Sequence, residues 1–399
     1  MNKISTLFVA LLFLSACGDG KTAVAVQVKV LASPVGDSSA LPHLVTDPTG
    51  KVFLSWIEKR NGIASLQFAT LSSDQWSTPV TIASGNNWFV NWADYPVVAS
   101  DGQRHLLAHF LQKRDTSKYA YDVQLTSSGD GGKRWSEPIT LHDDGLAAEH
   151  GFVSMVPYQQ GFFATWLDGR NSAGGHGAGH GGHHGAMTLR GAVLDIAGRK
   201  LQEWELDDRV CDCCQTAAAV TDSGLVVVYR NRSDDEVRDM SIVRYANGQW
   251  TAPQIVFPDH WRIEGCPVNG PRIDARGGQL AVAWFGMREG KEAQVNVIFS
   301  ADDGAHFGKP VRIDSGKPLG RVDVLWLRSD TALVSWMEGD SIKATKVTAN
   351  GYKAPSFLVA TSSTGRSSGF PQMTLYGQQV LFAWTDDATK SVQVAVVTL

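Results

Sequence analysis

The apolar positions of this chain fall into a pattern that recurs seven times. Each copy is a run of seven mostly hydrophobic residues with a bulky ring at its fifth position. The runs are Val52–Glu58, His105–Leu111, Phe162–Asp168, Leu225–Asn231, Leu280–Gly286, Ala332–Glu338 and Val380–Asp386. Their rings recur at a mean interval of roughly 55 residues, a period that is typical of the blades of a β-propeller.

Shorter strand-like segments surround every run. In the first repeat they cover residues 41–47, 63–71 and 76–82, which together with the run itself makes the four strands of a propeller blade. The seventh repeat ends at Leu399 after its third strand. The segment Ala23–Leu31 alternates with period two and is not used elsewhere, so we expect it to supply the missing strand and close the ring.

Composition fits one large all-β domain. Hydrophobic residues make up 43% of the 399 positions, which is enough to fill a sizeable core, and a propeller of this length need not divide into separate domains. Two stacked β-sandwiches are the alternative. The net charge is -4, and the basic residues are scattered along the chain. We therefore expect no nucleic-acid partner, because such proteins carry a basic stripe or patch.

The N-terminal segment predicts where in the cell the protein is located. Lys3 is followed by the apolar run Ile4–Leu14, which is too short to span a bilayer, and then by the sequence Leu-Ser-Ala-Cys that ends at Cys17. This arrangement resembles a bacterial lipoprotein signal. The resemblance implies a signal peptide over 1–16, lipidation of Cys17, a linker over 17–22 and a propeller over 23–399. Because Gly18 follows the cysteine, it also implies an outer-membrane lipoprotein facing the periplasm or the exterior. An ordinary secretory signal is the alternative.

Two segments between third and fourth strands share the pattern Ser-x-Asp-x-Gly-x-x-Trp/Phe. In such a turn the Ser and Asp side chains can accept hydrogen bonds from amides, and Gly tolerates a positive φ. The segments resemble the Asp-box (BNR repeat) of sialidases and similar propellers, which implies a fold and no particular activity. Their residues are Ser128, Asp130, Gly132 and Trp135 in one box and Ser300, Asp302, Gly304 and Phe307 in the other.

Sialidases bind the carboxylate of their substrate with three arginines, so the resemblance implies that this chain should contain equivalent arginines. The first belongs to an Arg-Ile-Pro motif, at which this chain has Leu41-Pro42-His43. Arg272 and Arg321 enter the fifth and sixth blades and can stand for the other two. With the first arginine missing, we expect a binding or scaffold module, and we keep an exo-sialidase that removes terminal acidic sugars as the alternative.

Polar residues collect where second strands end and first strands begin, on one face of the predicted wheel. Ligands of propellers usually bind there, and a carboxylate beside arginines can recognise a carbohydrate or an anionic small ligand. A protein partner is the other candidate. The residues that we single out for binding are Asp168, Arg170, Arg230, Arg238, Asp239, Arg272 and Arg321.

The loop that leaves the third blade's second strand is rich in glycine and histidine. Neutral imidazole is a ligand for copper, zinc and nickel, and a glycine tether allows several rings to converge. A passive surface insert is the alternative. The candidate ligands are His176, His180, His183 and His184, with His150 at the start of the third blade as a further one.

Four cysteines lie at the start of the fourth and fifth blades. Cys211, Cys213 and Cys214 precede the fourth, and Cys266 precedes the fifth. In an oxidising compartment an even set favours disulfides, either a vicinal pair with a Cys211–Cys266 bridge or a bridge from one of the adjacent pair to Cys266. The competing interpretation is a thiolate site for copper(I) or zinc.

We therefore expect a lipid-anchored, monomeric, seven-bladed propeller of the sialidase-like type that binds a ligand on one face and carries a copper or zinc site. A structural assembly factor is a third hypothesis, and it would require a large apolar patch.

Overall fold

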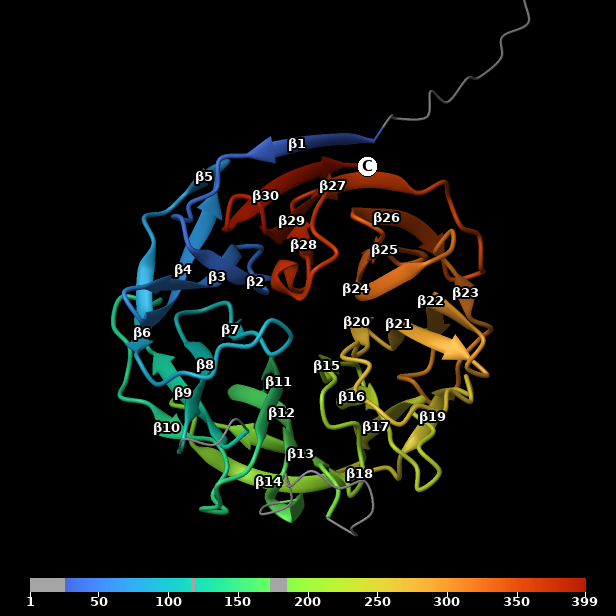
Figure 1. Cartoon of the computed structure of the whole chain (residues 1–399), viewed down its shortest axis with the longest axis horizontal. Helices are drawn as coiled ribbons and strands as arrows, with labels where there is room; N and C mark the ends of the chain where they lie inside the picture. The colour runs from blue at the N-terminus through green and yellow to red at the C-terminus, as the bar shows by residue number, and fades with distance from the viewer. Residues whose placement is uncertain (1–25, 116–118, 173–184) are drawn as a thin grey trace, which may run out of the picture.

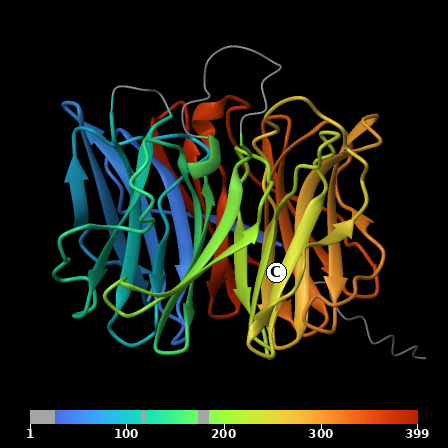
Figure 2. The ribbon, with the colours of Figure 1, turned by 90° about the horizontal axis from the view of Figure 1, so that it is seen from below.

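The predicted seven-bladed propeller is confirmed by the computed structural model, which describes residues 26–115, 119–172 and 185–399. Figure 1 shows the blades as a closed ring around a central axis, and Figure 2 shows the strands running between two faces. Among the described residues no helix is long and apolar enough to cross a membrane.

The first four blades follow each other in chain order. Blade 1 is β2 (Ser39–Thr46), β3 (Val52–Arg60), β4 (Ile63–Ser72), β5 (Gln75–Trp76) and β6 (Val80–Gly85). Blade 2 is β7 (Val98–Ser100), β8 (Leu106–Lys113), β9 (Tyr121–Ser128) and β10 (Ile139–Thr140). Blade 3 is β11 (His150–Tyr158), β12 (Gly161–Asp168), β13 (Thr188–Leu194) and β14 (Lys200–Asp207), with the short 3-10 helix η1 (Arg170–Ser172). Blade 4 is β15 (Ala217–Val220), β16 (Leu225–Arg230), β17 (Met240–Ala246), β18 (Gln249–Trp250) and β19 (Gln254–Phe257).

The remaining three blades complete the circle. Blade 5 is β20 (Arg272–Arg276), β21 (Gln279–Arg288), β22 (Glu292–Ser300) and β23 (Val311–Arg312). Blade 6 is β24 (Pro318–Arg328), β25 (Thr331–Glu338), β26 (Ser341–Thr348) and β27 (Phe357–Thr361). Blade 7 is β28 (Gln372–Tyr376), β29 (Gln379–Asp386) and β30 (Ser391–Thr398), preceded by the 3-10 helix η2 (Arg366–Ser368).

The seventh blade takes its outer strand from the other end of the chain, as predicted. Strand β1 (Gln27–Leu31) pairs antiparallel with β30, and Gln27 lies opposite Thr398. Figure 1 shows β1 along the outer edge of this blade. The pairing satisfies the edge of β30 and joins the two ends of the chain, so the ring is closed by backbone hydrogen bonds.

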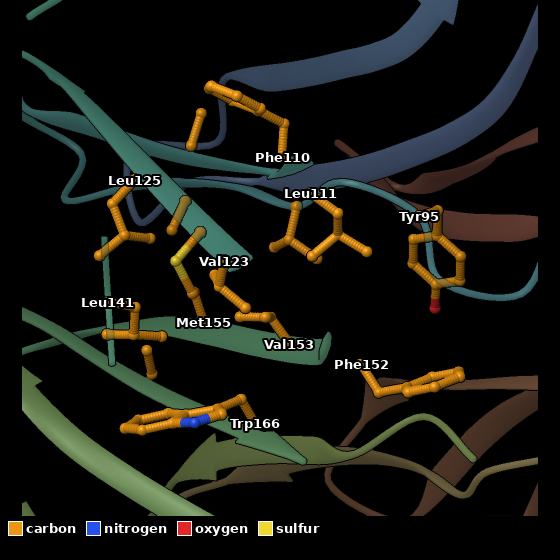
Figure 3. Close-up of a cluster of buried hydrophobic side chains, with 14 of the residues drawn as sticks. Tyr95, Phe110, Leu111, Val123, Leu125, Leu141, Phe152, Val153, Met155 and Trp166 are labelled. Atoms are coloured by element: carbon orange, nitrogen blue, oxygen red, sulfur yellow. The ribbon is translucent and has the colours of Figure 1, made fainter. Parts of the chain in front are cut away.

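The repeated rings form the spine of the core. Trp56, Trp166, Trp284 and Trp336 are among the largest fully buried side chains, and His109 and Tyr229 occupy the same position in their blades. Neighbouring blades pack face to face through their apolar residues. In Figure 3, Leu111 and Val123 of blade 2 lie beside Val153 and Met155 of blade 3. The alternation of each strand therefore buries side chains between blades on both faces, which explains the continuous apolar runs.

The two Ser-x-Asp segments form the same turn at the lower face, where third strands end. The Ser128 hydroxyl accepts from the Gly132 amide at 2.9 Å, and Asp130 Oδ1 accepts from the Arg134 amide at 2.9 Å. The equivalent bonds from Gly304 to Ser300 and from His306 to Asp302 are 3.0 and 2.9 Å. Gly132 and Gly304 have φ values of 89° and 80°. Both turns therefore sit at the face opposite the candidate ligand residues.

Candidate functional site

The cysteines form a compact cluster on the upper face, the face at which second strands end and first strands begin. Cys211, Cys213 and Cys214 lie in the connection from β14 to β15, and their sulfur atoms all lie within 4.8 Å of one another. Cys211 Sγ is 3.4 Å from Cys214 Sγ and 4.0 Å from Cys213 Sγ. Cys266, from the connection between β19 and β20, interacts with Cys213. Two neighbouring blades thus contribute to one sulfur cluster.

In the structure none of these four cysteines takes part in a disulfide, in contrast to the pairings that we expected from the sequence. The sulfur separations are those of atoms in contact, since a bonded pair is only about 2.05 Å apart. Cys211 and Cys214 are buried, whereas Cys266 is exposed. The cluster is therefore buried at Cys211 and Cys214 and accessible at Cys266, and its free sulfurs are compatible with the alternative interpretation, a thiolate site.

Positive charge surrounds the innermost sulfur. Arg238 donates to Cys211 Sγ at 3.2 Å, and the same guanidinium binds Glu236 at 2.6 Å. Hydrogen bonds from the Cys213 and Cys214 thiols, together with Arg238 and Arg230, hold the pKa of Cys211 well below its usual range. Hydrogen bonding to Cys213 also lowers the pKa of Cys266. Two of the four sulfurs are thus predisposed to be thiolates, the form that binds metals.

Arg230 and Asp239 are structural in this arrangement. The buried Arg230 guanidinium donates to the backbone oxygens of Asn269 and Phe285 at 2.8 and 2.6 Å, and so joins blade 4 to blade 5 beneath the cysteines. Asp239 accepts from the amides of His260 and Trp261. Both side chains are therefore engaged in hydrogen bonds within the fold.

Asp168 and Arg170 meet at the end of β12, where the sequence placed them. They form a bidentate pair in which two guanidinium nitrogens each lie 2.8 Å from a carboxylate oxygen. Burial raises the pKa of Asp168, but the hydrogen bonds from Arg170 outweigh it and leave the pKa at about 2. His150 Nε2 lies 3.7 Å from the same carboxylate. Asp168 and Arg170 therefore bind each other, and neither residue belongs to the cysteine cluster.

A cavity of about 440 Å³ follows the axis of the wheel and is lined by the first strands of several blades. Arg272 enters it from β20, lies 3.5 Å from Asp323, donates to Gln372 at 2.5 Å and faces the ring of Tyr95. Burial raises the pKa of Asp323, and Arg272 opposes that rise. The cavity therefore combines one guanidinium with a carboxyl, an amide and a ring, which is a set suited to a polar ligand.

The cavity also contains a neutral imidazole, which belongs to the segment Leu41-Pro42-His43. His43 lines the axial cavity, and burial followed by the charge of Arg272 lowers its pKa to about 3. Arg321 does not enter the cavity as a free guanidinium, because it donates to the Ser368 hydroxyl at 2.6 Å and to the Gly365 carbonyl at 2.9 Å. Of the arginines we proposed as a clamp, only Arg272 lines this cavity.

A tyrosine and a glutamate pair close to the cavity. The Tyr121 hydroxyl donates to Glu149 Oε1 at 2.6 Å, and burial raises the pKa of Glu149 to about 7. Tyr121 is 1% exposed and stacks on Phe89 with ring centroids 4.0 Å apart. Its hydroxyl is therefore sealed from solvent.

Comparisons with known proteins support the propeller fold and indicate no particular function. No protein family profile matches the sequence, and no curated protein matches it. The NanB sialidase of Streptococcus pneumoniae is similar over 94% of both chains, with 10% identity and a TM-score of 0.45. A mutant puromycin hydrolase matches 88% of this chain and 50% of its own, with 13% identity and a TM-score of 0.50. A Trypanosoma rangeli sialidase mutant matches 90% of this chain and 54% of its own, with 12% identity and a TM-score of 0.42. The neighbours are sialidases and other propellers.

Several predicted residues lie outside the part of the chain that the structure describes. These are the lipidation site Cys17 with its signal peptide, and the loop histidines His176, His180, His183 and His184. Their roles stay predictions.

Sequence reasoning missed residues that reach the upper face from connections between blades. Residues 88–97 cross toward the axis, where Trp92 stacks on Phe370 of the last blade and Asp94 lines the cavity. His142 and Asp144 lie in the connection that leads to β11. These segments belong to no repeat, so the periodicity could not indicate them. The only signal was the density of aromatic and charged residues in connections between blades.

Proposed function

We propose that this protein is a propeller of the bacterial cell envelope, lipid-anchored at Cys17, that binds copper(I) or zinc(II) through its cysteine cluster. One observation carries the proposal. Three sulfurs from the start of blade 4 lie within 4.8 Å of one another, and Cys266 meets them from blade 5. Thiolates are the soft ligands that select these ions, and four of them are one of the usual structural zinc sets.

The surroundings suit a charged metal–thiolate centre. Four thiolates around a zinc(II) ion carry a net charge of about -2, which would be unfavourable in a buried position without compensation. Arg238 already donates to Cys211 Sγ, and Arg230 lies beneath the cluster. The exposed Cys266 and half-buried Cys213 leave a route by which an ion can enter and leave.

The proposal is tested on the purified full chain, reduced and loaded with zinc(II) or copper(I) under anaerobic conditions. Metal content and competition against a chelator should give one tightly held ion per chain. Cys211→Ser and Cys214→Ser should lose it. Arg238→Met should weaken binding by about 10- to 100-fold, as removal of outer partners of metal ligands generally does.

Arg232→Met is the matched control for Arg238→Met. Arg232 pairs with Asp212 and Glu236 in the same loop and donates to none of the cysteine sulfurs. It should leave metal affinity nearly unchanged. If protein isolated without reductant has no titratable thiols after unfolding, the cysteines are disulfides in the native envelope, and the metal proposal is wrong.

The histidine-rich loop adds a separate proposal. If His176, His180, His183 and His184 converge on an ion, copper(II) should bind more tightly than zinc(II), following the usual order of stability. Replacing all four by Ala should remove this binding without affecting the cysteine cluster. Binding no tighter than that of a scrambled Gly-His peptide would leave the loop as a passive insert.

A second candidate function is recognition of a carbohydrate or another anionic ligand in the axial cavity. The observation that favours it is Arg272, a guanidinium beside Tyr95 and Gln372 in a cavity of about 440 Å³. Hydrolysis of a terminal acidic sugar is the catalytic version of this candidate. Binding of sialic acid, glucuronic acid and neutral sugars to the wild type and to Arg272→Met, measured by calorimetry, distinguishes an acidic-sugar site from an empty channel.

A further inference from the structure

A second group of metal-ligating side chains lies buried on the upper face between blades 2 and 3. It consists of two triads that share His150, namely Asp122 with His142 and His150, and Asp144 with His150 and Asp168. His142 and Asp144 lie in the connection that precedes β11, His150 is the first residue of β11, and Asp122 lies near the start of β9. The imidazoles of His142 and His150 are stacked, with centroids 3.5 Å apart and planes 5° apart. Both side chains are at most 1% exposed. This group uses none of the residues of the cysteine cluster.

His142 is buried without a hydrogen bond at either ring nitrogen. Its Nε2 lies 3.3 Å from Asp122 Oδ1, and its Nδ1 lies 3.5 Å from Asp144 Oδ2, but neither contact has hydrogen-bond geometry. A buried polar group without a partner is costly, and a native structure rarely keeps one without a reason. An ion between His142 and Asp144 would supply the missing partner.

The hydrogen-bond contacts of His150 also point to a site at Asp144. Its Nδ1 lies 3.3 Å from the Tyr121 carbonyl oxygen, which can only accept, so the tautomer that satisfies this contact carries its proton on Nδ1. The Nε2 lone pair of the neutral ring then points at Asp144 Oδ2, 2.8 Å away. A lone pair and a carboxylate repel each other, so either a proton or a metal ion must lie between them.

Fixing one imidazole nitrogen by a hydrogen bond is the usual way in which proteins direct the other nitrogen to a metal. The Tyr121 carbonyl does this for His150, and Asp122 is placed to do it for His142. Asp168 is paired with Arg170, whereas Asp144 Oδ2 lies within 3.5 Å of a nitrogen of both imidazoles and 3.4 Å from Arg170 Nε.

We propose that His142, His150 and Asp144 bind a divalent cation of the zinc class, with Asp122 and the Tyr121 carbonyl orienting the two imidazoles. Two imidazoles and one carboxylate are a donor set for zinc, cobalt, nickel or iron(II), and not for copper(I), which prefers sulfur. Because the two rings are parallel in the structure, binding must tilt them out of their stack. The site leaves coordination positions free for water or a ligand.

Cobalt(II) titration of the full chain tests the site, because cobalt reports its own ligands. Thiolate ligands give charge-transfer bands in the near ultraviolet, whereas a nitrogen and oxygen site gives only visible bands. We expect Asp144→Asn and His150→Gln to lose one equivalent of cobalt(II) while the thiolate bands persist, and Cys214→Ser to do the reverse. The four loop histidines are replaced by Ala in all these chains, so that they cannot contribute.

His105→Gln is the matched control. His105 also pairs with a carboxylate, at 2.5 Å from Asp101, but lies near the opposite face. His105→Gln should change neither the thiolate charge-transfer bands nor the visible bands of the nitrogen and oxygen site. Zinc(II) should raise the melting temperature of the wild type and of this control, and raise it less in Asp144→Asn. Equal uptake by Asp144→Asn, His150→Gln and the wild type would overturn the proposal, as would a wild type whose only cobalt bands come from thiolates.

Discussion

At the scale of single residues, Glu149 shows how burial sets a pH dependence. Its pKa is raised from 4.5 to about 7, chiefly because burial disfavours the carboxylate. The folded state therefore keeps a proton that the unfolded state loses near pH 4.5. Since the unfolded state binds fewer protons in this window, the free energy of unfolding must fall as the pH rises from about 4.5 through 7.

Glu149→Gln should remove this loss of stability with rising pH, because the amide keeps an acceptor for the Tyr121 hydroxyl and does not ionise. The stability of the variant relative to the wild type should rise between pH 5 and pH 8 by up to about 3 kcal/mol, which corresponds to the shift in pKa. Urea unfolding at the two pH values measures it. A constant difference between the two proteins would contradict the assignment.

Gly132 is a residue whose identity the backbone dictates. It has a φ of 89°, and a Cβ there would lie 2.3 Å from Phe68 Cζ. Gly132→Ala should destabilise the protein by about 1–3 kcal/mol, since strain and overlap act together. Gly129→Ala is the control in the same turn, because a Cβ there meets nothing within 4 Å. Similar unfolding midpoints for the two variants would show that the turn adapts.

At the scale of elements, the closing strand β1 is the part whose removal should matter most. Its side chains are largely exposed, so its contribution comes from backbone pairing with β30. A chain that begins at residue 33 should expose the edge of β30, melt at a lower temperature and aggregate. A chain that begins at residue 26 keeps β1 and serves as the control. Identical melting curves for the two chains would refute the closure by β1.

The elements were predictable to the degree that they repeat. The ring positions from Trp56 to Trp384 located the second strand of every blade, and the unused segment before Leu31 located the closing strand, because an unpaired edge has to be covered. His109 is fully buried and accepts from the Val97 amide, as expected of a core residue that replaces a ring. Connections between blades have no period, so the path of Trp92 toward the axis could not be derived.

At the scale of the whole molecule, sequence spacing says little about which upper-face residues meet. Cys211 and Cys266 are far apart in the chain and adjacent in space, because blade 5 follows blade 4 around the ring; this was predictable once the blades were counted. The sequence could not predict that Arg230 and Arg321 donate to neighbouring carbonyls and hydroxyls, because those contacts depend on the paths of the connections between blades. A surface arginine and a structural one look the same in a sequence.

The last prediction concerns catalysis by the axial cavity. A sialidase needs an arginine clamp, whereas here the segment Leu41-Pro42-His43 has no arginine and Arg321 is engaged elsewhere. A bidentate clamp cannot form from Arg272 alone with the strength that three guanidiniums provide. We therefore expect negligible release of sialic acid from a fluorogenic sialoside by the wild-type chain, measured beside an authentic sialidase. Robust turnover that Arg272→Met abolishes and Arg232→Met leaves intact would instead establish the hydrolase, because only Arg272 of these two lines the cavity.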